Sequence, residues 1–124
     1  DAIMTPGSHC YFDHYQADPE TEPLAIGGFT TLKKVYSYQP VPDTFSTTEA
    51  HHILGAQGNV WTEYMETTDY VEYMILPRMA ALAEVTWTGK KDWNQFKTKI
   101  PTHFIFYEKL GYNYCDHPFV IENN

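Results

Sequence analysis

The chain has 124 residues, of which 43% are hydrophobic and 19% are charged, values that suit one folded domain and exclude an intrinsically disordered protein. The formal net charge is −8, with eight Lys and Arg against sixteen Asp and Glu, so nucleic acid and anionic membrane surfaces are poor candidate partners. No apolar stretch is long enough to cross a bilayer, and we predict no membrane span. Aromatic residues are frequent, at 16%, and composition alone is compatible with either an aromatic core or a binding surface.

In chain order, the sequence divides into segments with distinct patterns of apolar and turn-forming residues. These segments are a strand with its loop (1–16), a loop with a helix (17–43), a second strand with its loop (51–66), a kinked helix (69–88) and a terminal helix (92–110). The two strands are short apolar runs, residues 2–5 and 51–57, and both are expected to be buried. Each ends in a turn of small or helix-breaking residues, after which polar side chains accumulate.

Local signals define where the helices begin and end. The first helix begins near Thr31 and ends before Pro40. Pro77 lacks a backbone donor, so it should kink or divide the helix in residues 69–88. Asp92 is a good N-cap, Gly111 ends the last helix, and Pro101 implies an irregular turn inside it. The side chains of this helix expected to face inward are Phe96, Ile100, Phe104 and Tyr107.

The order of elements predicts an α/β fold. Apolar strands separated by helices indicate parallel strands joined by crossovers, and parallel strands need cover on both faces. Two strands are too few for a stable parallel sheet, so we predict part of a larger α/β sheet or barrel. In such folds, functional residues gather in the loops at the carboxyl ends of the strands. Residues 8–16 and 58–66 lie in such loops.

Each of these loops carries an aromatic residue and a carboxylate two positions apart. Tyr11 and Asp13 would point the same way in an extended segment, and Trp61 and Glu63 repeat that spacing. On neighbouring strands, the four side chains would surround one pocket, where aromatic faces could stack on a sugar ring and carboxylates could accept its hydroxyl protons. The alternative is that Trp61 belongs to the core and that the carboxylates are solvated loop charges.

Other side chains that could do chemistry form no known motif. Four histidines lie in or beside the two loops: His9, His14, His51 and His52. No pair of them has the spacing of a helix-borne metal motif, so we assign them structural or surface roles and predict no metal site and no cofactor. Cys10 and Cys115 form neither a disulfide framework nor a paired metal motif. Arg78 and Glu84 lie in the kinked helix and are interpreted as members of structural ion pairs.

The sequence resembles the last third of the catalytic barrel of family 20 glycoside hydrolases, the β-N-acetylhexosaminidases. The resemblance covers nearly the whole chain, in the right order, through "MTPGSHCYFDHYQ", "TLKKVYSYQPVP", "ILGAQGNVWTEYM" and "YMILPRMAALAEVTW". The run from Gly55 to Glu63 is the most specific of these motifs. It carries Gly58 where alanine is common, which we expect to be a minor change.

The resemblance implies a (β/α)₈ TIM barrel that removes terminal β-linked N-acetylglucosamine or N-acetylgalactosamine. In this family the acetamido oxygen of the substrate attacks the anomeric carbon, with net retention. By the same resemblance, Tyr11 hydrogen-bonds that oxygen, Asp13 contacts the hydroxyls at C4 or C6, Trp61 forms a wall of the −1 pocket, and Glu63 holds the C4 hydroxyl. The expected ligands are glycans that end in N-acetylhexosamine.

The family's catalytic Asp-Glu pair has no counterpart in these residues. A full barrel needs roughly 250 residues. We therefore expect a C-terminal fragment of about two strand-helix units plus a terminal helix, inactive by itself, from a periplasmic or extracellular parent protein. Such a fragment should expose apolar surface and could self-associate through it. The alternatives are a non-catalytic carbohydrate-binding module and a purely structural segment.

Overall fold

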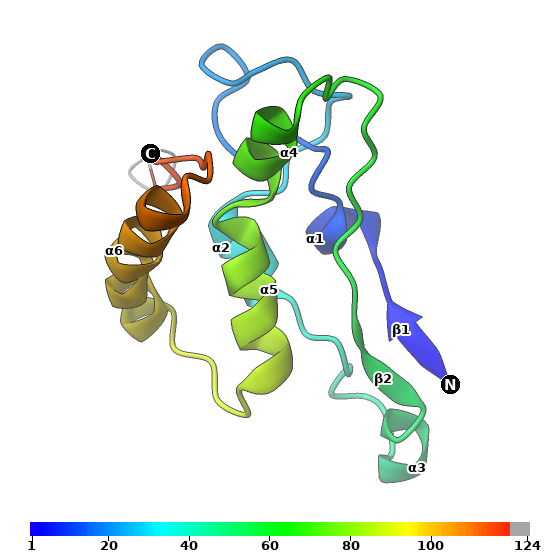
Figure 1. Cartoon of the computed structure of the whole chain (residues 1–124). Coiled ribbons are helices and arrows are strands. Elements are labelled where there is room, and N and C mark those ends of the chain that lie inside the picture. Colours follow the sequence, from blue (N-terminus) through cyan, green and yellow to red (C-terminus); the bar gives the residue numbers. More distant parts are fainter. Residues whose placement is uncertain (120–124) are drawn as a thin grey trace.

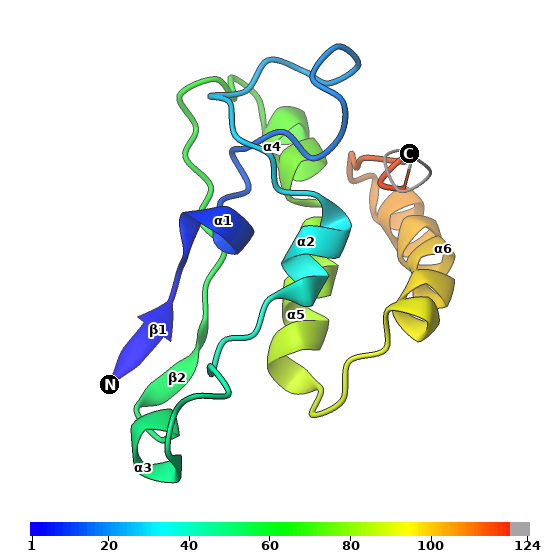
Figure 2. The same cartoon turned by 180° about the vertical axis from the view of Figure 1, so that it is seen from behind.

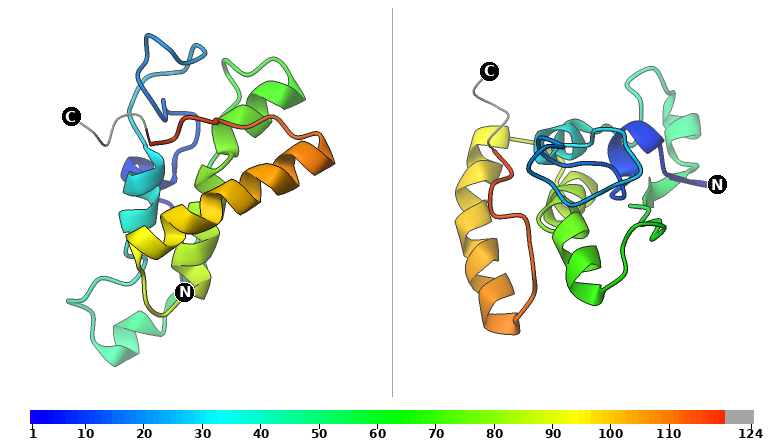
Figure 3. Two further views of the ribbon diagram at one scale, coloured as in Figure 1. Left: turned by 90° about the vertical axis from the view of Figure 1, so that its left-hand side faces the viewer. Right: turned by 90° about the horizontal axis from the view of Figure 1, so that it is seen from above.

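The computed structural model describes residues 1–119. Its elements follow the order β1 (Ala2–Met4), α1 (Gly7–Cys10), α2 (Leu32–Ser37), α3 (Thr47–Ala50), β2 (Ile53–Ala56), α4 (Thr68–Ile75), α5 (Arg78–Trp87) and α6 (Trp93–Leu110). The strands lie on one side, α2 and α5 in the middle, and α6 on the other side (Figures 1 and 3). Within residues 1–119, no helix is both long and apolar enough to cross a bilayer.

The strands β1 and β2 form a parallel pair, as predicted. The register steps from Ala2 opposite Ile53 to Ile3 opposite Gly55, so one extra residue of β2 bulges there. Gly55 adopts φ +150°, which favours glycine at this position. The prediction of buried strands is wrong, because Ile3 is 55% exposed and Leu54 is 64% exposed. The expected exposure of apolar surface is confirmed, and self-association through it stays a prediction.

The core lies between α2, α5 and α6. Thr31 caps α2 by accepting a hydrogen bond from the Lys34 amide at 3.1 Å, and one face of the helix then packs against α5. The buried side chains that these helices contribute are Leu32, Val35, Tyr36, Ala81, Leu82, Val85, Phe96 and Ile100. The predicted helix near Thr31 is therefore confirmed.

Pro77 divides the predicted long helix into α4 and α5. Leu76 ends α4 in an extended conformation, with φ −102° and ψ 132°, as steric conflict with a following proline favours. Pro77 then stands immediately before α5, where its missing amide hydrogen costs no helical hydrogen bond. The division places Arg78, the first residue of α5, beside the loop that follows β1.

The terminal helix α6 begins and ends as predicted. Asp92 accepts a hydrogen bond from the Gln95 amide at 3.0 Å, and Gly111 ends the helix with φ +73°. The predicted irregular turn at Pro101 is wrong, because the helix continues through this residue. Pro101 lies on the exposed side, where a carbonyl that loses its helical donor can bond to water.

Candidate functional site

The loops that follow β1 and β2 run side by side at the same end of the sheet, as predicted (Figure 2). The Gln57 amide donates to the Met4 carbonyl at 3.0 Å. Beyond α1, the Asn59 amide donates to Cys10 at 2.7 Å, and the Phe12 amide donates back to Asn59 at 2.8 Å. These bonds form an isolated parallel bridge between Tyr11 and Asn59. The pairing thus resumes past the strands and brings the two loops together.

The prediction that Tyr11 and Asp13 extend along one wall is wrong. The chain turns over residues 12–14, so the two side chains do not share an extended segment. Tyr11 is half-buried with its ring 5.6 Å from that of His14, whereas Asp13 is only 6% exposed. Arg78 stabilises this turn, because its guanidinium donates hydrogen bonds to the carbonyls of Phe12 and His14.

Arg78 is a fully buried cation that organises this end of the molecule. Its nitrogens donate to main-chain carbonyls in α4 and in the segment between α1 and α2, those of Met74, Phe12, His14 and Thr30. Burial lowers the pKa of Arg78 to about 9, and the nearby Cys115, Glu22 and Asp13 act in the opposite direction. The predicted ion pair is therefore wrong for Arg78. For Glu84 it is confirmed, with Lys99 at 2.7 Å.

Sequence reasoning missed this role of Arg78, although a signal existed. Arg78 is the only arginine of the chain, and it follows the apolar run "YMILP". A lone guanidinium in such a position needs several acceptors, and main-chain carbonyls provide them when no carboxylate is in contact. The structural ion pair that we predicted is therefore only one of two ways to satisfy a cation at this position.

Asp13 carries a buried oxygen that lacks a protein partner. Within residues 1–119, its Oδ1 atom is inaccessible to solvent and makes no hydrogen bond. Orphaned polar atoms are rare in folded proteins and point to an absent ligand or to strain. Because this atom is closed to solvent here, a ligand could reach it only after the turn over residues 12–14 moves.

Trp61 and Glu63 lie on the open side of the second loop. Trp61 is 53% exposed and forms one wall of an open pocket of about 190 Å³, which residues 57–60 also line. Glu63 is exposed. Within the described residues 1–119, no hydrogen bond or ion pair joins any two of the four predicted site residues. A larger pocket of about 350 Å³ lies at the beginning of β2 and contains none of them.

The histidines of this region have the structural roles that were predicted. His14 shares a hydrogen bond of 3.1 Å between its Nδ1 and the Thr30 hydroxyl, and His9 stacks on Tyr38 with 5.2 Å between ring centroids. Burial lowers the pKa of both imidazoles, which favours their neutral forms. His52 is exposed on the surface beside Asp1.

Gly58 is not the minor change that the sequence suggested. A Cβ atom at this position would lie 2.7 Å from Cε2 of Phe12. Phe12 is 1% exposed, and its ring lies under the Arg78 guanidinium, 5.1 Å from the ring centroid. Because the ring is held on both sides, it has little room to move away. Glycine is the residue that lets the two loops approach this closely.

Replacing Gly58 with alanine is expected to lower the free energy of unfolding by about 1–3 kcal/mol, the usual cost of overpacking. Urea denaturation followed by circular dichroism measures this quantity. Gly89→Ala is the matched control, because a Cβ there meets no atom within 4 Å. It should be neutral or slightly stabilising. Equal stability of the two variants would contradict the close contact between Gly58 and Phe12.

Comparison with known proteins identifies the origin of this arrangement. Residues 1–90 match the family model for the glycosyl hydrolase family 20 catalytic domain. A beta-hexosaminidase of Porphyromonas gingivalis is 44% identical over 117 residues, covering 92% of this chain and 15% of the relative. The family 20 beta-N-acetylhexosaminidase of Streptomyces coelicolor superposes with a TM-score of 0.80 at 23% identity, covering 94% of this chain and 24% of that one. The structure of an exo beta-N-acetylglucosaminidase of Vibrio harveyi in complex with N-acetylglucosamine superposes with a TM-score of 0.77 at 28% sequence identity. The match covers 90% of this chain and 18% of that one.

The fold and the two loops therefore define a segment of a glycoside hydrolase with a TIM-barrel catalytic domain. Its strands and helices correspond to part of one such barrel, and the predicted fold class is confirmed. The chain belongs to glycosyl hydrolase family 20. It spans less than a quarter of the length of the relatives that were compared, 15% and 24% in the first two cases.

Proposed function

We propose that the chain is part of a retaining, substrate-assisted β-N-acetylhexosaminidase and that it supplies sugar-binding residues of the −1 subsite. The observation that carries this proposal is the parallel bridge between Tyr11 and Asn59, which joins the two motif-bearing loops at one end of the sheet. Relatives named beta-hexosaminidase and a related structure in complex with N-acetylglucosamine support the substrate class. Hydrolysis would release terminal N-acetylglucosamine or N-acetylgalactosamine, in a periplasmic or extracellular parent protein.

Tyr11 is the residue of this chain that acts on the reacting atoms. In the proposed mechanism, its hydroxyl donates to the acetamido oxygen while that oxygen attacks the anomeric carbon and develops an oxazolinium-like charge distribution. The half-buried ring has support from His14, and within residues 1–119 its hydroxyl has no hydrogen-bond partner to give up. A donor that is already oriented before reaction costs little reorganisation.

The remaining residues hold the sugar. Asp13 would accept a hydrogen bond from the hydroxyl at C4 or C6, and Glu63 would accept one from the C4 hydroxyl. Trp61 would offer an aromatic face to the apolar side of the ring. Because Trp61 and Glu63 are exposed in this chain, their side chains are free to meet a substrate or the rest of a barrel.

Acid catalysis requires a group from outside this chain. No adjacent Asp-Glu pair occurs in the 124 residues, and each carboxylate assigned here binds a hydroxyl instead of the leaving oxygen. The isolated chain is therefore expected to bind N-acetylhexosamine weakly and to turn over no substrate. Robust hydrolysis by the isolated chain would show that a proton donor is present within it.

Replacing Tyr11 with phenylalanine in the full-length enzyme is expected to lower kcat about 100-fold and to change KM much less, because the lost bond strengthens in the transition state. Hydrolysis of a chromogenic N-acetylglucosaminide measures both constants. Tyr112→Phe is the control, since Tyr112 follows α6, far from the loops in the chain, and its ring is 46% exposed. The control should retain full activity.

The proposal fails if turnover survives both Tyr11→Phe and Trp61→Ala unchanged. An intact parent protein that binds N-acetylglucosamine but hydrolyses nothing would instead favour the non-catalytic carbohydrate-binding module. A parent that neither binds nor hydrolyses would leave a purely structural role for these aromatic residues.

A further inference from the structure

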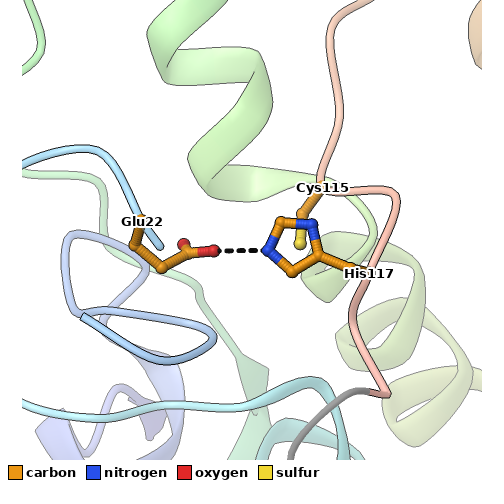
Figure 4. A group of neighbouring side chains, drawn as sticks. All are labelled: Glu22, Cys115 and His117. Carbon is orange, nitrogen blue, oxygen red and sulfur yellow. Dashed lines mark hydrogen bonds and ion pairs between the residues drawn. The ribbon is translucent and has the colours of Figure 1, made fainter. Parts of the chain in front are cut away.

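Three potential metal ligands meet at a place that is separate from the sugar-binding loops. Glu22 lies in the loop before α2, and Cys115 and His117 lie in the segment after α6 (Figure 4). One carboxylate oxygen, the Sγ atom and one imidazole nitrogen all lie within 4.8 Å of one another. The sequence holds no signal for this cluster beyond the Cys-x-His spacing, since Glu22 and His117 are 95 residues apart.

Glu22 presents a carboxylate with one unused oxygen. Its side chain is 0% exposed. The Oε1 atom accepts from the Tyr73 hydroxyl at 2.8 Å and lies 3.0 Å from Nε2 of His117. The Oε2 atom is buried and, within residues 1–119, has no hydrogen-bond partner. A fully buried carboxylate oxygen without a partner is costly unless a cation or donor meets it.

His117 is oriented in the way that metal-binding histidines are. Its Nδ1 lies 3.0 Å from the Asp116 carboxylate, while Nε2 faces Glu22. A carboxylate on one ring nitrogen fixes the ring and makes the other nitrogen a better ligand. The Tyr73 hydroxyl supports Glu22 in the same manner. Both of these supporting contacts exist without any further rearrangement.

Cys115 supplies the third ligand from a rigid position. It is fully buried and free of any disulfide, and its amide donates to the Leu76 carbonyl at 3.1 Å. Cys115 and Glu22 lie close enough to Arg78 to raise its pKa, against the effect of burial. When a divalent cation binds and the thiol releases its proton, the cation, one thiolate and one carboxylate together form a neutral unit beside this buried guanidinium.

We propose that Glu22, Cys115 and His117 form a Zn²⁺ site. A mixed set of sulfur, nitrogen and oxygen donors suits Zn²⁺. Tetrahedral coordination with bonds of about 2.0–2.3 Å requires ligand atoms about 3.5 Å apart, so binding needs only a small contraction of the cluster. Water completes the coordination on the side of His117, which is 31% exposed. The ion fastens the segment after α6 to the loop before α2.

Cobalt substitution tests the proposal directly in the 124-residue chain, reduced and freed of metal. Co²⁺ should bind one equivalent and produce a thiolate-to-cobalt charge-transfer band in the near ultraviolet, and Zn²⁺ should displace it. Cys115→Ser should abolish the band, whereas Cys10→Ser, which removes the other buried thiol, should retain it. His117→Gln should weaken Zn²⁺ binding by at least about 100-fold, since even loss of an outer contact costs 10–100-fold.

Circular dichroism of each variant separates metal loss from unfolding. If Cys115→Ser does not fold, His117→Gln decides the matter, because its side chain is partly exposed and the substitution is well tolerated at such sites. Absence of a charge-transfer band in the folded wild-type chain would overturn the proposal and leave a hydrogen-bonded cluster of Tyr73, Glu22 and His117. A band that survives Cys115→Ser would overturn it as well.

Discussion

Replacing Arg78 with methionine is expected to lower the free energy of unfolding by about 3–5 kcal/mol, because several buried carbonyls lose their donor at once. The side chain is 0% exposed, and methionine can fill much of its volume without replacing any of its hydrogen bonds. The carbonyls left without this donor are those of Phe12, His14, Thr30 and Met74. Urea denaturation of the wild-type and variant chains measures the change.

Lys99→Met is the control, since it removes a half-exposed cation that pairs with a single carboxylate, that of Glu84, which is 16% exposed. Loss of one ion pair to a partly solvated lysine should cost less than loss of all the hydrogen bonds of a fully buried guanidinium, so the control should lie between Arg78→Met and the wild type. Arg78→Lys should fall between the two, because it keeps the charge but not the planar fork of donors. If Arg78→Met were no less stable than Lys99→Met, the carbonyl contacts would not be important for stability.

The same substitution has a consequence for the candidate site. Arg78 holds the turn over residues 12–14, which carries Asp13 and follows Tyr11 directly. A loosened turn would move both side chains in the parent enzyme, although Arg78 itself is assigned no contact with the sugar. Arg78 is therefore a positioning residue in the proposed mechanism. It connects the stability of the α4–α5 junction to the geometry of the first loop.

Features that depend on local physics could be predicted from the sequence. Pro77, Asp92 and Gly111 each act through their own backbone or a side chain a few residues away, and the structure places them where spacing indicated. The short helix α3 could have been predicted as well. Ser46 and Glu49 have the spacing of a capping box, and both of its hydrogen bonds are present.

Features that depend on distant contacts could not be predicted. Burial of β1 and β2 depends on neighbouring elements, and a two-stranded sheet leaves Ile3 and Leu54 exposed. The turn that separates Tyr11 from Asp13 depends on the guanidinium of Arg78, and the bonded residues are 64 and 66 positions apart in the chain. The close contact between Gly58 and Phe12 likewise depends on how the two loops pack together, which the sequence pattern does not specify.

Replacing Phe96 with alanine is expected to lower the free energy of unfolding by about 3–5 kcal/mol, because a large ring is removed from a closed core. Phe96 is 0% exposed, stacks on Tyr36 with 4.6 Å between ring centroids, and lies 5.9 Å from the Trp93 ring. The residue is in α6, outside residues 1–90, which the family model matches. Urea denaturation with circular dichroism and tryptophan fluorescence shows whether α6 unfolds together with α2 and α5.

Phe106→Ala provides the control from the same helix, because Phe106 is 57% exposed. Both variants change phenylalanine to alanine at a helical position, so the effect on helix propensity is shared and the difference between them reports burial. The control should change stability by no more than about 0.5 kcal/mol. One cooperative transition, shifted to lower urea in Phe96→Ala, is the expected result. Two separate transitions would instead mean that α6 folds independently of the α2–α5 core and does not support the loops that carry the candidate site.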